Sequence, residues 1–128
     1  MPLYRCTLKE GLSTEAQRAA IAKEVVRVHC DVTGAPATFV HAIFAEAEAA
    51  ALPDGLDAFM LGSIRAGRND EQKASIHSQL ADFIGTTLGT PAVRVVTADV
   101  PASWVMEGGD ILPEPGEEAE WLARHGEA

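Results

Sequence analysis

Pro2 is the residue near the start of the chain with the most unusual chemistry. Methionine aminopeptidase removes Met1 when a small residue follows it, and removal leaves the ring nitrogen of Pro2 as a secondary amine. An α-amine titrates near neutrality, and burial or neighbouring charges shift its pKa in either direction. Such an amine can act as a general base or a general acid. Taken alone, however, Pro2 is more often an ordinary second residue.

Arg65 and Arg68 form the second candidate, because they occur as Arg-Ala-Gly-Arg between an expected strand and an expected helix. Two guanidinium groups near the N-terminus of a helix suit a carboxylate, through bidentate hydrogen bonds and the helix dipole. The alternative is that both arginines pair with Asp70, Glu71 or other acidic residues of this acidic chain.

His29 and Glu107 are weaker candidates by themselves. His29 lies beside the apolar stripe of an expected helix, where a single histidine is more often a hydrogen-bonded core residue. Glu107 precedes two glycines and is either a mobile catalytic carboxylate or an ordinary loop acid. His41, His77 and His125 receive no role. The spacing of a metal site, a phosphate-binding loop or a Ser-His-Asp triad does not occur in the sequence.

Composition limits the class of protein. The chain has 128 residues and a formal net charge of −9, which indicates one domain over residues 1–128 and argues against nucleic acid as a partner. No segment is apolar for long enough to span a membrane, and the N-terminus lacks the pattern of a signal peptide. Cys6 and Cys30 have no metal-ligand spacing, so we expect reduced thiols in a cytoplasmic protein.

The first half of the chain is expected to form a strand, a helix and a second strand. Alternating residues predict a strand over 3–8, and apolar residues at three- and four-residue steps predict a helix over 14–33. Thr14 can cap this helix, with Gln17 completing a capping box. Residues 38–46 are mostly apolar, which predicts a second, central strand.

The same order of elements recurs 55 residues further along the chain. Thr14 corresponds to Asn69, another favourable N-cap residue. The apolar stripe Ile21, Val25 and Val28 corresponds to Ile76, Leu80 and Phe83. We therefore predict two β-α-β halves, over about 2–46 and 57–101, followed by a tail over 107–128.

Two β-α-β halves predict an α/β (α+β) fold, in which a four-stranded sheet carries two helices on one face. The other face holds apolar side chains that need cover, and another copy of the chain is the simplest source. We therefore predict a homo-oligomer. The acidic tail is expected to drape over the body or over a neighbouring subunit, anchored by Ile111, Leu112, Trp121 and Leu122.

The candidate catalytic and binding residues of one half are not found at the equivalent positions of the other half. Across the repeat, Pro2 corresponds to Asp57, His29 to Ile84, Arg65 to Glu10 and Arg68 to Ser13. The chemistry is therefore expected at one end of the repeat only.

Together these features resemble the tautomerase superfamily, and within it the cis-3-chloroacrylic acid dehalogenase group. The resemblance covers most of the chain. It rests on the opening Met1-Pro2-Leu3-Tyr4, on VHCDVTG around His29, on Arg65-Ala-Gly-Arg68, and on EGGDILPEPGEEAEW from Glu107. The LPxPGxExEW pattern of the tail is the most specific part.

The resemblance implies a tautomerase-like fold, a homotrimer, no cofactor or metal, and roles for five residues. Pro2 would be the catalytic N-terminal proline. Arg65 and Arg68 would bind and polarise the carboxylate of a small substrate, with help from His29. Glu107 would activate water in a hydration step.

Val96 stands where the dehalogenases have a tyrosine that works with the glutamate on water. Because valine forms no hydrogen bond, water activation would rest on Glu107 alone. We therefore expect tautomerase activity on a small keto or enol carboxylate. The alternatives are a hydratase or dehalogenase of 3-haloacrylate-type acids, and a non-enzymatic trimeric interaction protein.

Overall fold

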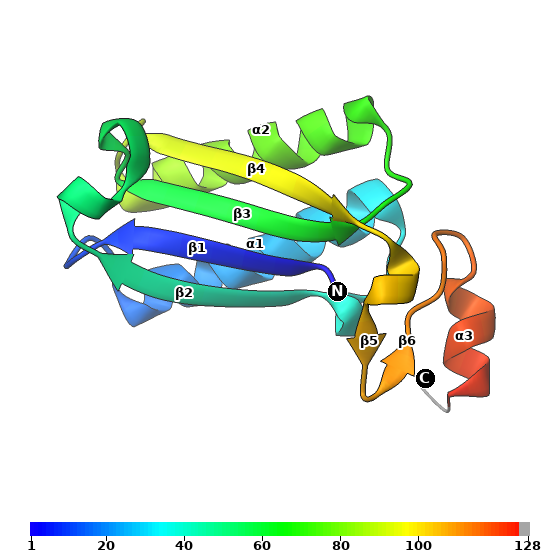
Figure 1. The fold of residues 1–128 in the computed structure, drawn as a ribbon. Helices are drawn as coiled ribbons and strands as arrows, with labels where there is room; N and C mark the ends of the chain where they lie inside the picture. The colour runs from blue at the N-terminus through cyan, green and yellow to red at the C-terminus, as the bar shows by residue number, and fades with distance from the viewer. Residues whose placement is uncertain (126–128) are drawn as a thin grey trace.

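The computed structural model describes residues 1–125 (Figure 1). Its main elements are β1 (Leu3–Lys9), α1 (Glu15–Thr33), β2 (His41–Ala47), β3 (Ala58–Arg65), α2 (Asp70–Leu88), β4 (Val93–Val100), β5 (Met106–Glu107), β6 (Asp110–Ile111) and α3 (Glu118–Arg124). Among these residues, no helix combines the length and the apolar character needed to cross a membrane.

Both long helices begin and end at the residues that the repeat predicts. Thr14 and Asn69 each form a complete capping box with the residue three positions later. Gly34 and Gly89 end the helices in the left-handed conformation that glycine adopts without a steric penalty. The two halves therefore have helices of 19 residues each.

The four long strands form one sheet in the order β2-β1-β3-β4. Within each half the strands are parallel, and β1 pairs with β3 in the antiparallel sense. The prediction that residues 38–46 form a central strand is wrong, because β2 is an edge strand that begins at His41. A 3-10 turn over Ala37–Phe39 follows Pro36 and delays its start.

Both helices cover one face of the sheet, as Figure 1 shows, and the core lies between them. Ile21, Val25 and Val28 of α1 are buried as predicted, together with Ile76 and Leu80 of α2. The predicted counterpart Phe83 is only partly buried, and its neighbour Ile84 is fully buried instead. Helix α2 therefore turns slightly different residues toward the sheet than the repeat predicts.

The tail forms a small second cluster at the end of the sheet where β1 begins and β3 ends (Figure 1). Residues 107–110 form the turn of the β5–β6 hairpin, with Gly108 and Gly109 at positive φ. Leu112 and Trp121 are buried anchors as expected, whereas Ile111 is 54% exposed. The short helix α3 was not predicted.

Candidate active site

The candidate residues converge on the end of the sheet that the tail covers. Pro2 is buried directly before β1, and Arg65 is the last residue of β3. His29 lies in the last turns of α1, and Arg68 precedes α2. Glu107 lies in the hairpin of the tail. Elements far apart in the sequence thus bring the five residues to one end of the fold.

His29 is a buried, hydrogen-bonded residue, as the simpler interpretation of the sequence expects. Its side chain is 1% exposed, and Nδ1 lies 2.8 Å from the hydroxyl oxygen of Tyr4. Gly62 makes room for the Tyr4 ring, because a Cβ at that position would collide with it. Burial, together with the charges of Arg68 and Arg65, lowers the pKa of His29 to about 3. His29 is therefore neutral at physiological pH.

His29→Gln is expected to flatten the pH dependence of stability between about pH 6.5 and 5. The folded-state pKa is about 3, against an ordinary value of 6.5, so in this range the unfolded chain binds a proton at His29 that the folded chain does not. Acidification then lowers the free energy of unfolding by up to about 1.4 kcal/mol per pH unit from this residue. Urea unfolding at several pH values measures the slope, with His125→Gln as the control. Equal slopes in the wild type and His29→Gln would contradict the assignment.

Arg65 is fully engaged by the tail. Its side chain is 1% exposed, and its two terminal nitrogens donate to the carbonyl oxygen of Pro113 at 2.6 Å and to Oε2 of Glu118 at 2.9 Å. It also stacks over the ring of Phe39. Although burial disfavours a charged carboxylate, hydrogen bonds from Arg65 and from backbone N–H groups keep the pKa of Glu118 below its usual value. Glu118, which the sequence analysis did not single out, is therefore the counterion of Arg65.

Arg68, in contrast, has free donors. Its Nη1 donates to the carbonyl oxygen of Thr33 at 3.3 Å, and the closest carboxylate, Glu118, lies 3.9 Å from Nη2. Within residues 1–125, Nε and Nη2 are buried without a hydrogen-bond partner. Nε and Nη2 form one edge of the guanidinium, which can bind both oxygens of a carboxylate. The alternative from the sequence, that both arginines pair with acidic residues, holds for Arg65 through Glu118, and neither arginine pairs with Asp70 or Glu71 among the described residues.

Glu107 meets the amino terminus of the chain. Its Oε1 lies 3.6 Å from the amine of Met1 and 3.2 Å from Nε2 of His41. Burial lowers the pKa of the Met1 amine, and the negative charge of Glu107 opposes that shift. His41, which received no role from the sequence, is thus brought to the site by strand pairing. Its backbone N–H donates to the carbonyl oxygen of Pro2 at 2.9 Å.

Val96 does not lie beside Glu107 of the same chain. It is on β4, the edge strand opposite β2, in register with Leu61 of β3. Strands in a sheet are spaced at 4.7–4.9 Å, so three strand spacings, or about 14 Å, separate β4 from β2. Within one chain, the residue beside Glu107 is therefore His41.

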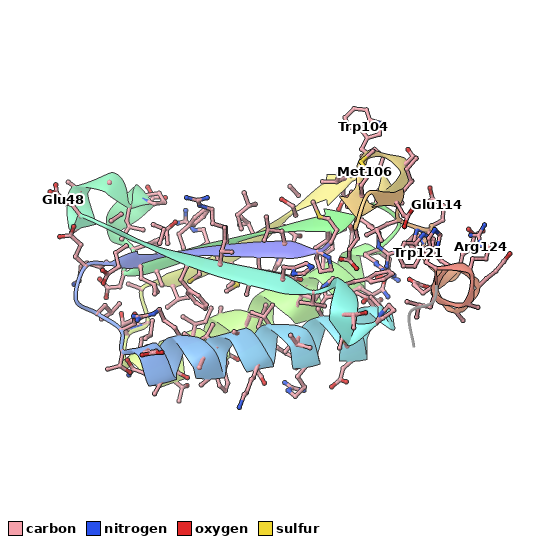
Figure 2. The ribbon with its side chains drawn as sticks, turned by 90° about the horizontal axis from the view of Figure 1, so that it is seen from below. Glu48, Trp104, Met106, Glu114, Trp121 and Arg124 are labelled. Carbon is pink, nitrogen blue, oxygen red and sulfur yellow. The ribbon has the colours of Figure 1, made fainter. Side chains whose placement is uncertain are left out.

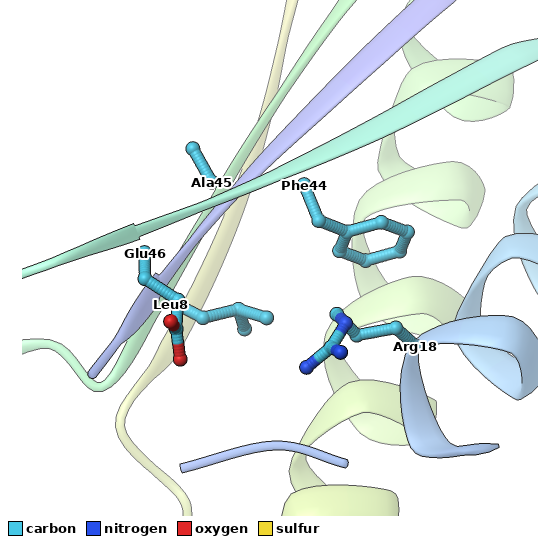
Figure 3. Close-up of a pocket in the computed structure, with 5 residues that line it drawn as sticks. All are labelled: Leu8, Arg18, Phe44, Ala45 and Glu46. Carbon is cyan, nitrogen blue, oxygen red and sulfur yellow. The ribbon is translucent and has the colours of Figure 1, made fainter. Parts of the chain in front are cut away.

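The other end of the repeat lacks this set of residues. A cavity of about 290 Å³ opens there, lined by Leu8, Arg18, Phe44, Ala45 and Glu46 (Figure 3). Arg18 already donates to the carbonyl and hydroxyl oxygens of Ser13, and Glu46 accepts from the backbone of Gly11. Asp57, the counterpart of Pro2, pairs with Lys9. The cavity therefore does not reproduce the candidate site.

Solved structures of known proteins resemble this chain in both sequence and fold. A scan against protein-family models finds no match, and a search of the curated proteins finds none. Among solved structures, N1, a member of the cis-3-chloroacrylic acid dehalogenase family, is 33% identical with a TM-score of 0.87, and the match covers 95% of this chain and 91% of N1. Native Ps01740 is 37% identical over 83% of this chain and 100% of its own, with a TM-score of 0.75. A fused 4-OT symmetric trimer is 28% identical over 87% and 95%, with a TM-score of 0.76.

Proposed function

Because the chain belongs to the cis-3-chloroacrylic acid dehalogenase family of the tautomerase superfamily, we propose that it is a tautomerase for small keto or enol carboxylates. Removal of Met1 exposes the Pro2 nitrogen, which in the full chain is part of a peptide bond and has no basicity. The freed ring amine then transfers the proton at the carbon next to the keto group. No cofactor is needed for this step.

The buried, unpaired donors of Arg68 are the observation that carries this proposal. A guanidinium edge without partners in a buried site is costly, and a substrate carboxylate would satisfy both donors. Arg65 does not compete for that carboxylate with its terminal nitrogens, since Pro113 and Glu118 accept from them. Neutral His29 adds no charge, so Arg68 supplies the positive charge that the substrate faces.

In the proposed reaction, the carboxylate of a 2-oxo acid binds Arg68 and its C3 lies near the Pro2 nitrogen. The neutral amine removes a proton from C3, the C–H bond breaks, and its electrons form the enolate. The protonated Pro2 amine gives its proton to the enolate oxygen, which forms the enol and restores the neutral amine, and the reverse steps give the keto acid. The chemistry needs a proton carrier and a fixed carboxylate, which Pro2 and Arg68 provide.

Exchange of C3 hydrogens tests the proposal directly. 2-Oxobutanoate is dissolved in deuterium oxide with protein whose Met1 removal has been verified by intact mass, and the loss of the C3 proton signal is followed by NMR. We expect catalysed exchange by the processed protein and none by protein that retains Met1. Exchange at the uncatalysed rate with the processed protein would rule the tautomerase function out and leave hydration or a non-enzymatic interaction protein as the alternatives.

Hydration of an unsaturated acid is the second candidate function. It is favoured by Glu107, whose carboxylate lies 3.6 Å from the amine of Met1, the residue directly before Pro2. A carboxylate beside an amine can take a proton from water while the protonated amine gives one to carbon. 3-Haloacrylates and alkynoates are the substrate class for this reaction.

We also propose that the protein is a homotrimer, assembled through the face of the sheet opposite the helices. Ile43 and Leu61 on this face are 43% and 37% exposed. Trp104 and Met106, 75% and 56% exposed, project from the tail end of the molecule on the side away from the helices (Figure 2). The fused 4-OT structures are trimers of the same fold.

Leu61→Lys is expected to dissociate this assembly. Arg5 lies between Ile43 and Leu61 on this face, so a lysine at position 61 places a second positive charge beside it. Burying such a charge without a partner costs several kcal/mol. Light scattering at micromolar concentration should give three times the mass of the chain for the wild type and the single mass for the variant. Asp82→Lys, on the exposed surface of α2 on the other side of the sheet, is the matched control. A monomeric wild type would contradict the prediction.

A further inference from the structure

The side chain that hydrogen-bonds to the Glu107 carboxylate is His41, a residue to which the sequence analysis assigned no role. His41 Nε2 lies 3.2 Å from Glu107 Oε1, and the ring of His41 is half-exposed. Glu107 Oε1 is also the oxygen that lies 3.6 Å from the amine of Met1. In the unprocessed chain an imidazole, a carboxylate and the Met1 amine therefore meet at one point, one residue before Pro2.

Backbone structure holds both partners in place. The N–H of His41 donates to the carbonyl oxygen of Pro2, and β2 begins at this residue, in register with Leu3. Glu107 is paired with Asp110 in the β5–β6 hairpin. The contact between the two side chains thus follows from two independent strand pairings, one in the sheet and one in the tail.

No tyrosine of the same chain can take the place of His41. The sequence contains one tyrosine, Tyr4, and its hydroxyl group is buried against His29 on the helix side of the sheet. Val96 lies three strands away on β4. Among the described residues, His41 is the side chain that hydrogen-bonds to Glu107.

We propose that His41 is a positioning residue for hydration, so that water activation does not rest on Glu107 alone. The Nε2–H of His41 donates to Oε1 of Glu107 and aims the carboxylate at a water molecule. This inference rests on the second candidate function. It names the group that orients the general base.

The hydration step is balanced for propynoate. Glu107 takes a proton from water as the water oxygen bonds to C3, and protonated Pro2 gives its proton to C2. One of the two π bonds between C2 and C3 is lost. The resulting enol rearranges to 3-oxopropanoate, and the proton on Glu107 returns to Pro2 through solvent.

The test compares His41→Ala and His41→Gln in propynoate hydration, with His77→Gln as the control. The amide nitrogen of glutamine can occupy the position of Nε2, so His41→Gln preserves the hydrogen bond, whereas His41→Ala removes it. We expect His41→Ala to lower kcat roughly tenfold or more, the usual scale of a hydrogen bond to a charged group, with little change in KM. His41→Gln should recover most of the rate. His77 lies on α2 and is hydrogen-bonded to Thr97, so His77→Gln should leave kcat and KM unchanged.

Each failure has a distinct meaning. Wild-type protein that does not hydrate propynoate overturns the second candidate function and this inference with it, but leaves the tautomerase proposal standing. Hydration that is unaffected by His41→Ala overturns this inference alone. His41→Gln as slow as His41→Ala overturns the positioning role, because the restored hydrogen bond would then have no effect. A rise in KM with kcat unchanged also overturns it, because His41 would then act on substrate binding.

Discussion

Pro2→Ala, with Met1 removed, is expected to lower the rate of C3 hydrogen exchange by about 10²–10⁴-fold, the usual contribution of a positioned general base. Alanine also permits removal of Met1, so the variant keeps an amine at the same place in the chain. That amine is primary and rotates about its bond to Cα, whereas the nitrogen of proline is secondary and held in a ring. The readout is the loss of the C3 proton signal of 2-oxobutanoate.

The controls for this variant separate chemistry from folding. Pro91→Ala replaces an exposed proline just before β4, at the opposite end of the sheet, and should leave the rate unchanged. Protein that retains Met1 has an amide nitrogen at Pro2 and should show no catalysed exchange. If processed Pro2→Ala exchanges as fast as the wild type, the N-terminal amine is not the base and the proposed mechanism is wrong.

Arg68→Met is expected to raise the KM for 2-oxobutanoate by roughly 100-fold or more, because it removes two hydrogen bonds from a charged group to the carboxylate. The change in kcat should be much smaller, since the proton is carried by Pro2. Folding should survive, because methionine replaces a buried charge whose Nε and Nη2 have no partner among the described residues. Removing a buried charge whose donors lack partners also removes the cost of its desolvation.

Two matched variants complete the Arg68 experiment. Arg94→Met removes an exposed arginine that pairs with Asp54, and it should change neither KM nor the melting temperature appreciably. Arg68→Lys keeps the charge but lacks the planar fork, so it should give an intermediate KM. An Arg68→Met variant with the KM of the wild type would show that the carboxylate binds elsewhere.

Local sequence signals predicted the fold well. The capping boxes at the helix starts and the glycines at the helix ends are short-range features, because each acts within one helical turn. They correctly located α1 and α2, and the 55-residue repeat correctly joined them to four strands. The errors occurred where tertiary context decides. Strand β2 is at the edge rather than in the centre, and α3 depends on the packing of Trp121 against Phe39.

The candidate site could be predicted only in part. Pro2, Arg65, Arg68, His29 and Glu107 are named by the sequence and lie at one end of the fold. The sequence did not predict that Arg65 and Arg68 differ in their hydrogen bonding, because this difference depends on contacts with the tail. Pro113 and Glu118 accept hydrogen bonds from Arg65, over 48 and 53 residues of sequence, whereas Nε and Nη2 of Arg68 have no hydrogen-bond partner among the described residues.

The sequence by itself determined the duplicated β-α-β architecture, the helix boundaries and the types of residue available for chemistry, because periodicity and capping are local properties. Only the tertiary structure decided which of these residues meet. His41 reaches Glu107 across 66 positions of the chain, and Tyr4 reaches His29 across 25. Such contacts follow from strand register and from how the tail packs, and neither property is encoded in the residues near the contact.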